Sequence, residues 1–284
     1  MARGTTRKMT TQNEFGIAVL LPTRGRTDAL SRSVLSLINR CVMQDRVQII
    51  FGFDTDDEVG KQHFAKELQP WLDAKKVHYL AMEFEPLGYE RLNEYVNALG
   101  AASSADWLFF WNDDAIMEST GWDREILKHT GEFKLLAVHT HRDHPYSIFP
   151  IVPRAWMEQL GYLSPHALTD AWTSQIAYKL DIWERIPVYV THDRHDLTGN
   201  NNDETFRNRV MFEGNPNHPK DFHHPHWIAL RMRETDTLSK YMQTQGMDTT
   251  FWDNIKLGQQ DPWEKLKVND VNKQMAQFNL TIRQ

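Results

Sequence analysis

Residues 106–118 read Asp-Trp-Leu-Phe-Phe-Trp-Asn-Asp-Asp-Ala-Ile-Met-Glu, and this stretch decides the predicted fold. Its apolar run, 107–111, has the length and composition of a buried strand. The run ends in Asn112, Asp113 and Asp114, and carboxylates are too costly to bury alone, so they must face solvent, a cation or a ligand. Ligands of an α/β sheet bind at the carboxyl ends of its strands, so we predict that the two carboxylates hold a divalent metal ion and, through it, a phosphate.

The composition limits the class of protein. The chain has 284 residues, of which 40% are hydrophobic and 25% charged, as in ordinary globular proteins with a sizeable core. The formal net charge of −6 argues against a broadly basic nucleic-acid surface. A single cysteine, Cys41, excludes an intramolecular disulfide and fits a reducing compartment. Residues 1–13 lack the apolar core of a signal peptide and no apolar run approaches a membrane span, so we expect a soluble, cytoplasmic protein.

The first half of the chain alternates apolar strands with amphipathic helices. We predict strands over 17–21, 47–51 and 77–82. We predict a helix after the first strand, capped by Thr27 or Asp28, and two further helices over 59–73 and 89–102. Together with the strand of the opening stretch, this order is typical of a parallel, doubly wound sheet.

The second half is less regular. Strands are predicted over 135–138, 148–152 and 186–191, helices over 156–160 and 170–180, a loop over 214–226, and a mostly helical region from about 228. The predicted organisation is a polar tail (1–13), one α/β domain (14–233) and a C-terminal helical extension (234–284).

Polar residues at the strand ends suit a nucleoside diphosphate. Arg24 and Arg26 suit phosphates or the base, because they supply positive charge beside a glycine that permits close approach. Asp54 suits a base N–H or a ribose hydroxyl. Asp113 and Asp114 suit a ribose and a hard cation, because carboxylate oxygens prefer Mg²⁺ or Mn²⁺.

In this order the motifs resemble the GT-A glycosyltransferases of the large family-two type, which use nucleotide sugars. The resemblance covers residues 17 to about 200 and has four parts, Leu21-Pro-Thr-Arg-Gly-Arg26, Gly52-Phe-Asp-Thr-Asp-Asp57, Arg91-x5-Asn97 and Asn112-Asp113-Asp114. The last part departs from the family's Asp-x-Asp motif by its first residue, Asn112. It implies a GT-A (Rossmann-like) fold, with a mostly parallel central sheet flanked by helices, a nucleotide-sugar half (14–118), an acceptor half (119–233) and a C-terminal helical tail.

The resemblance also implies an activity and a site. The chain would be a hexosyl- or pentosyltransferase that inverts the anomeric centre of a UDP-sugar, with Mn²⁺ or Mg²⁺ as cofactor. Asp170 would be the general base, and Asp114 with a late histidine, His192 in preference to His195, would hold the metal. The residues implied for nucleotide-sugar binding are Pro22, Thr23, Arg24, Arg26, Asp54, Asp56, Arg91, Asn97, Asn112 and Asp113.

The acceptor is not readable from the sequence. The short motifs, Pro22-Thr-Arg-Gly-Arg26 and His192-Asp-Arg-His195, are similar to those of small bacteriophage-encoded transferases, which implies a hydroxymethylated DNA base as one candidate, in the host cytoplasm. Basic residues within 1–8 or 207–233 would then contact phosphates, and binding should weaken steeply with salt.

Two alternatives stay open. The run His139-Thr-His141-Arg-Asp143-His144 matches the His-x-His-x-Asp-His pattern of the metallo-β-lactamase superfamily, which implies a zinc hydrolase. Its later ligands would come from His192 or His195, from Asp203 or Asp221, and from the histidines of 223–226. The other alternative is a non-catalytic nucleotide-sugar-binding domain of the same fold, in which Asp170 has no catalytic role.

Overall fold

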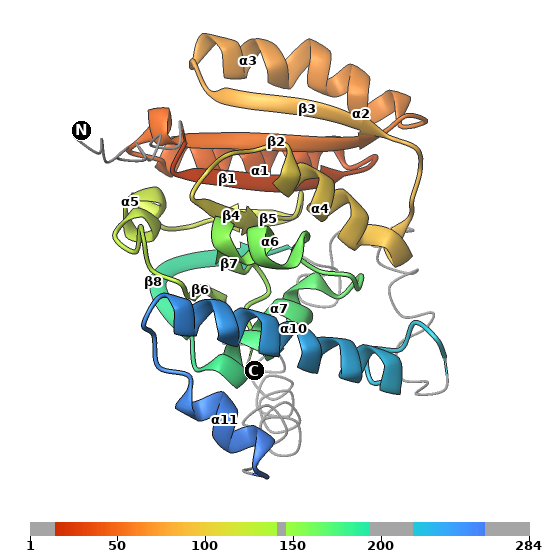
Figure 1. Ribbon diagram of the computed structural model, residues 1–284. Helices are drawn as coiled ribbons and strands as arrows, with labels where there is room; N and C mark the ends of the chain where they lie inside the picture. The colour runs from red at the N-terminus through yellow and green to blue at the C-terminus, as the bar shows by residue number, and fades with distance from the viewer. Residues whose placement is uncertain (1–14, 141–145, 194–217, 259–284) are drawn as a thin grey trace, which may run out of the picture.

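The structure is a computed structural model, which describes residues 15–140, 146–193 and 218–258. Its centre is an eight-stranded sheet in the order β3-β2-β1-β4-β7-β6-β8-β5. Figure 1 shows β3, β2 and β1 side by side. The strands are β1 (Ile17–Thr23), β2 (Val47–Asp54), β3 (His78–Phe84), β4 (Trp107–Phe110), β5 (Ala115–Met117), β6 (Leu135–Thr140), β7 (Ile151–Pro153) and β8 (Trp183–His192). The helices are α1 (Thr27–Arg40), α2 (Glu58–His63), α3 (Gln69–Ala74), α4 (Leu92–Ala101), α5 (Trp122–Leu127), α6 (Arg154–Leu160), α7 (Thr169–Leu180), α10 (Pro225–Thr244) and α11 (Thr250–Lys256).

The strands of the first half are parallel, as the sequence predicted. β1 pairs in parallel with β2 and with β4, and β2 pairs in parallel with β3. Along β1, Ile17, Val19 and Leu21 belong to the core on one face of the sheet, and Ala18 and Leu20 to the core on the other. Helices α1, α3 and α5 pack on the first face, and α4, α6, α7, α10 and α11 on the second. The continuous apolar character of β1 is therefore explained by burial on both faces.

The second half makes the sheet mixed. β7 pairs antiparallel with β4, β5 pairs antiparallel with β8, and β6 pairs in parallel with β8. β5 follows β4 after only residues 111–114, yet it lies at the far end of the strand order, beside β8. The sheet therefore curls, and the short connection that carries Asn112, Asp113 and Asp114 joins its middle to its last strand. The sequence did not predict β5, because three residues are too few for a periodic pattern.

Two local predictions about helices need correction. The cap of α1 is Arg26, with φ −103° and ψ 57° and no capping side chain, so the prediction of Thr27 or Asp28 was wrong. The helix predicted over 59–73 contains a wider π turn (Phe64–Leu68) between α2 and α3. Pro70 stands at the start of α3, where it lacks an amide hydrogen and crowds the preceding turn, and the wider turn accommodates it.

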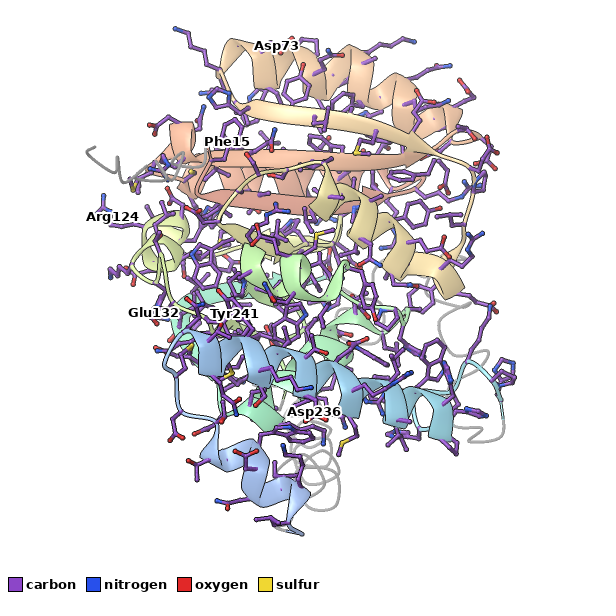
Figure 2. All side chains as sticks on the ribbon, viewed as in Figure 1. Phe15, Asp73, Arg124, Glu132, Asp236 and Tyr241 are labelled. Carbon is purple, nitrogen blue, oxygen red and sulfur yellow. The ribbon has the colours of Figure 1, made fainter. Side chains whose placement is uncertain are left out.

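Helix α10 links the C-terminal part of the chain to the α/β domain. It runs unbroken through the boundary predicted at 233 and packs against α6 and α7 (Figure 1). Figure 2 labels Tyr241 on this helix. The Tyr241 ring packs edge-on against Phe133, with ring centroids 5.0 Å apart. The Trp252 indole of α11 donates a hydrogen bond of 2.8 Å to Asp236. The chain thus has no break in structure at the expected boundary. Among the described helices, none is long and apolar enough to cross a membrane.

Candidate active site

Asp113 and Asp114 lie in the connection between β4 and β5 and are buried, with 6% and 4% of their surfaces exposed. The Thr23 hydroxyl donates a hydrogen bond of 2.8 Å to Asp113. Arg26 Nη1 donates to both carboxylates, at 3.0 Å to Asp113 Oδ1 and 3.1 Å to Asp114 Oδ2. The carboxylates therefore do not face solvent: of the possibilities that the sequence left open, they meet a cation, and that cation is Arg26.

His192 completes the group. The antiparallel pairing of β5 with β8 sets Ala115 opposite His192, which brings the imidazole Nε2 to 3.2 Å from Asp114 Oδ1. The ring is buried and packs edge-on against Phe149. The Asn112 amide nitrogen lies 3.5 Å from the same Nε2, so the residue that departs from the Asp-x-Asp motif contacts the histidine.

The electrostatics of this group are uneven. Burial raises the pKa of Asp113 to about 6, although Arg26 opposes the shift. Burial also acts to raise the pKa of Asp114, but its contacts with His192 and Arg26 outweigh that effect and lower it. Asp114 is thus the more strongly anionic member of the pair, which is the property required of a ligand for a hard cation.

The chemistry of the group fits a divalent metal ion. Within the described part of the chain, Asp114 Oδ1 is buried and has no hydrogen-bond donor of acceptable geometry, and it faces the His192 nitrogen. Such a carboxylate oxygen costs free energy unless a cation satisfies it. Carboxylate oxygen suits Mg²⁺ and Mn²⁺, and imidazole nitrogen is a ligand of divalent transition metals, so the donor set fits a divalent ion. Asp114 and His192 would hold the ion.

A second group of metal-type side chains lies elsewhere. His129, Glu132 and Glu184 place one potential ligand atom each within 4.8 Å of one another. The Lys134 ammonium lies 2.9 Å from Glu132 and 2.6 Å from Glu184. This lysine already neutralises both carboxylates, and we assign no metal site there.

The loop after β1 meets the end of β2 next to this group. Arg24 Nη1 donates to Asp54 Oδ2 at 2.7 Å, and Arg24 Nη2 donates to Asp56 at 3.0 Å. Asp57 caps α2 and accepts the Gly25 amide at 2.9 Å, which joins the two loops. Pro22, the sixth residue of β1, is partly buried and follows five buried residues of that strand.

Tyr95 is a residue of this site that sequence reasoning missed. Its buried hydroxyl donates to Asp54 Oδ1 and accepts the Leu87 amide at 2.8 Å. Burial and the nearby Asp54 carboxylate raise the pKa of Tyr95 to about 12, so the hydroxyl keeps its proton for donation. The only signal in the sequence was its place within Arg91-x5-Asn97, where it reads as an ordinary apolar helix position.

Replacing Tyr95 by phenylalanine should destabilise the fold by about 1–3 kcal/mol, because Asp54 and the Leu87 amide both lose a buried partner. Urea unfolding measures this change. Tyr79→Phe is the matched control, since its hydroxyl bonds Asp73 near the surface, and it should cost less than about 1 kcal/mol. Equal losses in the two variants would contradict the role given to Tyr95.

The structure does not bring Arg91 and Asn97 to the carboxylate group. Arg91, the N-cap residue of α4, is half exposed and forms an ion pair of 2.5 Å with Glu94 in the first turn of that helix. Asn97 donates to the Ser164 carbonyl at 2.7 Å and accepts the amides of Leu163 and Ser164 at 2.9 and 3.1 Å. Asn97 therefore ties α4 to the loop before α7. Nucleotide contacts by either residue remain predictions from the resemblance.

Asp170 lies in the first turn of α7, where its carboxylate accepts the Ala171 amide at 2.8 Å. Glu234 of α10 fixes this end of the helix, because it accepts the Trp172 indole at 2.7 Å and the Tyr162 hydroxyl at 2.6 Å. Trp172 is fully buried, as are Trp111 and Trp156, so these rings are core residues and not platforms for a sugar.

His166 anchors the loop that leads to Asp170. Its Nδ1 accepts the Leu168 amide at 3.1 Å, its Nε2 donates to the Lys220 carbonyl at 3.0 Å, and its ring packs on Trp172 and Trp227. Burial lowers its pKa to about 4 from an ordinary value of 6.5, with Arg231 adding to the shift and Asp221 opposing it.

This shift predicts acid destabilisation. The unfolded chain binds a proton at His166 near pH 6.5, whereas the folded chain binds it only near pH 4, so the free energy of unfolding falls as the pH drops between these values. The expected loss is about 2–3 kcal/mol. His166→Gln keeps an acceptor and a donor but cannot titrate. Urea unfolding at pH 7 and pH 4.5 should show a smaller pH dependence for this variant; an unchanged dependence would refute the assignment.

Several predicted residues lie outside the described residues. These are His195, Asp203, and three members of the hydrolase pattern, His141, Asp143 and His144. His139 is described and stacks on the Tyr189 ring at 4.7 Å. The N-terminal basic residues and the tail beyond 258 also fall outside the described ranges.

Comparisons with known proteins bear on the fold. No protein-family model matches the chain, and no curated protein matches it. Among solved structures, the mannosyltransferase PcManGT from Pyrobaculum calidifontis, in complex with GDP-Man and Mn²⁺, is similar with a TM-score of 0.53 and 10% identity over 94% of this chain and 79% of that one. S. aureus TarS 1–349 in complex with UDP is similar with a TM-score of 0.50 and 13% identity over 69% of this chain and 72% of that one. The chain spans less than two thirds of two further TarS structures that it matches, 58% of one and 43% of the other.

At these identities the likeness concerns the fold alone. The chain has the GT-A glycosyltransferase fold that the sequence predicted, a mixed α/β architecture with a curled eight-stranded sheet flanked by helices. This fold accounts for the described residues 15–130, which the His139–His144 pattern of a zinc hydrolase does not explain.

Proposed function

We propose that the chain is a metal-dependent, inverting glycosyltransferase that moves a sugar from a UDP-sugar to an acceptor hydroxyl. The observation that carries the proposal is the buried Asp113–Asp114 pair with His192 at its side, in the β4–β5 connection of a GT-A fold. The arginines of the β1–α1 loop supply the positive charge that a diphosphate requires.

The residues divide the work as follows. Asp54, held by Tyr95, would accept a base N–H, and Thr23 and Asp113 would contact the ribose. Asp114 and His192 would hold Mn²⁺ or Mg²⁺, which when bound supplies positive charge that stabilises the departing diphosphate. Arg26 would donate hydrogen bonds to oxygens of this diphosphate.

Asp170 would act as the general base. It takes the proton of the acceptor hydroxyl as that oxygen forms a bond to the anomeric carbon. The bond from the anomeric carbon to the diphosphate oxygen breaks on the opposite face, and its electron pair leaves with UDP. Attack from the face opposite the leaving group inverts the configuration at the anomeric carbon.

Calorimetry with UDP tests the proposal most directly. The protein should bind UDP in the presence of Mn²⁺, and binding should weaken at least about tenfold when EDTA removes the metal. GDP under the same conditions tests the preference for uracil. Equal UDP binding with and without the metal would refute metal dependence, and absence of binding in both would refute the transferase.

The acceptor is proposed only as a hydroxyl compound. A hydroxymethylated DNA base stays a prediction from the motif style, and the described part of the chain adds no support for it. Of the basic residues in 207–233, Lys220 forms an ion pair with Glu90, and Arg231 is buried against the rings of Phe222 and Trp172. These two side chains are engaged within the protein.

A further inference from the structure

Arg26 places its positive charge against the Asp113 and Asp114 carboxylates, where a cation offsets the cost of burying them. Its Nη1 lies 3.0 Å from Asp113 Oδ1 and 3.1 Å from Asp114 Oδ2, so one nitrogen bridges two side chains. The side chain is largely buried, with 14% of its surface exposed. In the structure, Arg26 is thus the principal positive charge in contact with both carboxylates, and His192 contacts only Asp114.

A divalent ion held by Asp114 would bind a carboxylate that Arg26 already contacts. Adjacent buried carboxylates repel each other, and a cation between them removes that repulsion. An ion at Asp114 would lie within a few ångströms of the guanidinium, where like charges repel strongly in a site of low effective dielectric. The two cations therefore compete for the pair.

We propose that Arg26 is the resident counter-cation of Asp113 and Asp114, that a divalent metal ion displaces it, and that the displaced guanidinium then binds the diphosphate. The exchange rests on the proposed function, because that function supplies the metal and the diphosphate. It turns Arg26 from a fixed ligand into a residue that couples metal binding to nucleotide binding.

The surroundings of Arg26 allow such a movement. Gly25, immediately before it, has φ +68° and nothing within 4 Å of the position of a Cβ, so the loop is open on that side. The neighbouring Arg24 is already held by Asp54 and Asp56. Of the two arginines in the loop, Arg26 is the one whose partners are the proposed metal site.

Arg32, in the helix α1 that Arg26 precedes, provides a matched control. It pairs at 3.0 Å with Asp193, the residue after His192, and its side chain is 54% exposed. Its replacement removes one positive charge near the site without removing a contact to Asp113 or Asp114. Arg32→Gln therefore reports the general electrostatic effect, and Arg26→Gln reports that effect plus direct competition.

The test measures Mn²⁺ binding in the absence of nucleotide. Electron paramagnetic resonance of the free ion reports how much Mn²⁺ is bound. Arg26→Gln should bind Mn²⁺ at least about tenfold more tightly than the wild type, and Arg32→Gln within about threefold of it. With Mn²⁺ saturating, UDP should bind Arg26→Gln at least about tenfold more weakly, as measured by calorimetry, and Arg32→Gln as the wild type does. Opposite changes in metal and UDP affinity are the signature of exchange, and a merely structural role would weaken both.

A second variant keeps the test open if Arg26→Gln does not fold. Arg26→Lys keeps the buried charge but binds carboxylates less well, so its Mn²⁺ affinity should lie between those of the wild type and the glutamine variant. Wild-type Mn²⁺ affinity in both Arg26 variants, with Asp114→Asn unable to bind the ion, would overturn the exchange and leave the proposed function standing. If neither the wild type nor the two Arg26 variants bind Mn²⁺, both the exchange and the proposed metal-dependent function are overturned. Binding by Arg26→Gln but not by the wild type would support the exchange.

Discussion

Replacing Asp114 by asparagine should abolish Mn²⁺ binding and lower kcat/KM on the order of 10³-fold. Asp114 is the carboxylate of the pair whose pKa is lowered, and its Oδ1 faces His192 without a hydrogen-bond donor of acceptable geometry in the described part of the chain. Asparagine has the same shape but no charge, so it cannot hold a hard cation in competition with Arg26. Electron paramagnetic resonance of Mn²⁺ and sugar-transfer or donor-hydrolysis kinetics measure the two effects.

The control for Asp114→Asn is Asp45→Asn, which makes the same chemical change at an exposed position far along the chain. It should leave Mn²⁺ binding and kinetics unchanged. Thermal unfolding shows whether Asp114→Asn retains the fold. If the Asp114→Asn protein is folded and binds Mn²⁺ with wild-type affinity, Asp114 is not a metal ligand.

Replacing Asp170 by asparagine should lower kcat by about 10²–10⁴-fold while leaving the affinity for UDP with Mn²⁺ within about twofold. Asp170 lies on α7, an element separate from the one that carries Asp113 and Asp114, so its removal does not alter the nucleotide side. The loss would be a loss of proton transfer alone. Single-turnover kinetics and calorimetry separate the two quantities.

Asp181→Asn is the matched control, because it makes the same change at the other end of α7. Asp181 has a left-handed backbone conformation, φ 56° and ψ 37°, which asparagine also tolerates, so this variant should fold and turn over normally. Full turnover by Asp170→Asn would refute the general-base role. If the wild-type protein binds UDP but transfers no sugar under any condition tested, the alternative of a non-catalytic binding domain is favoured.

The positions of the strand ends could be predicted because they follow from local patterns. The apolar runs at 17–21, 47–51 and 107–111 become β1, β2 and β4, and these pair in parallel. The carboxyl ends of parallel neighbours lie at one edge of a sheet, so Arg24 with Asp54, and Arg26 with Asp113, come together. Strand order alone thus brought together two pairs of residues that lie 30 and 87 positions apart in the sequence.

The partners within that group could not be predicted. The sequence suggested that Arg26 binds phosphate and that Asp113 and Asp114 face a ligand, but the structure pairs these side chains with one another. Asn97 holds the backbone at Leu163 and Ser164, a contact that the sequence did not predict, and its expected place at the nucleotide stays a prediction. Tyr95 looked like a core position until its hydroxyl met Asp54. Such contacts depend on side-chain directions and on packing between elements, which no local pattern encodes.

What the sequence by itself determined is the arrangement of the first half: buried parallel strands, helices between them, and polar groups where the strands stop. These features arise from hydrophobic periodicity and turn chemistry, which are properties of neighbouring residues. The resemblance implied that His192 and Asp114 share a metal, but only the tertiary structure shows how the two side chains meet, with His192 Nε2 3.2 Å from Asp114 Oδ1. That contact depends on β5, a strand of three residues, returning to pair with the end of β8, because the sheet curls to bury both of its faces.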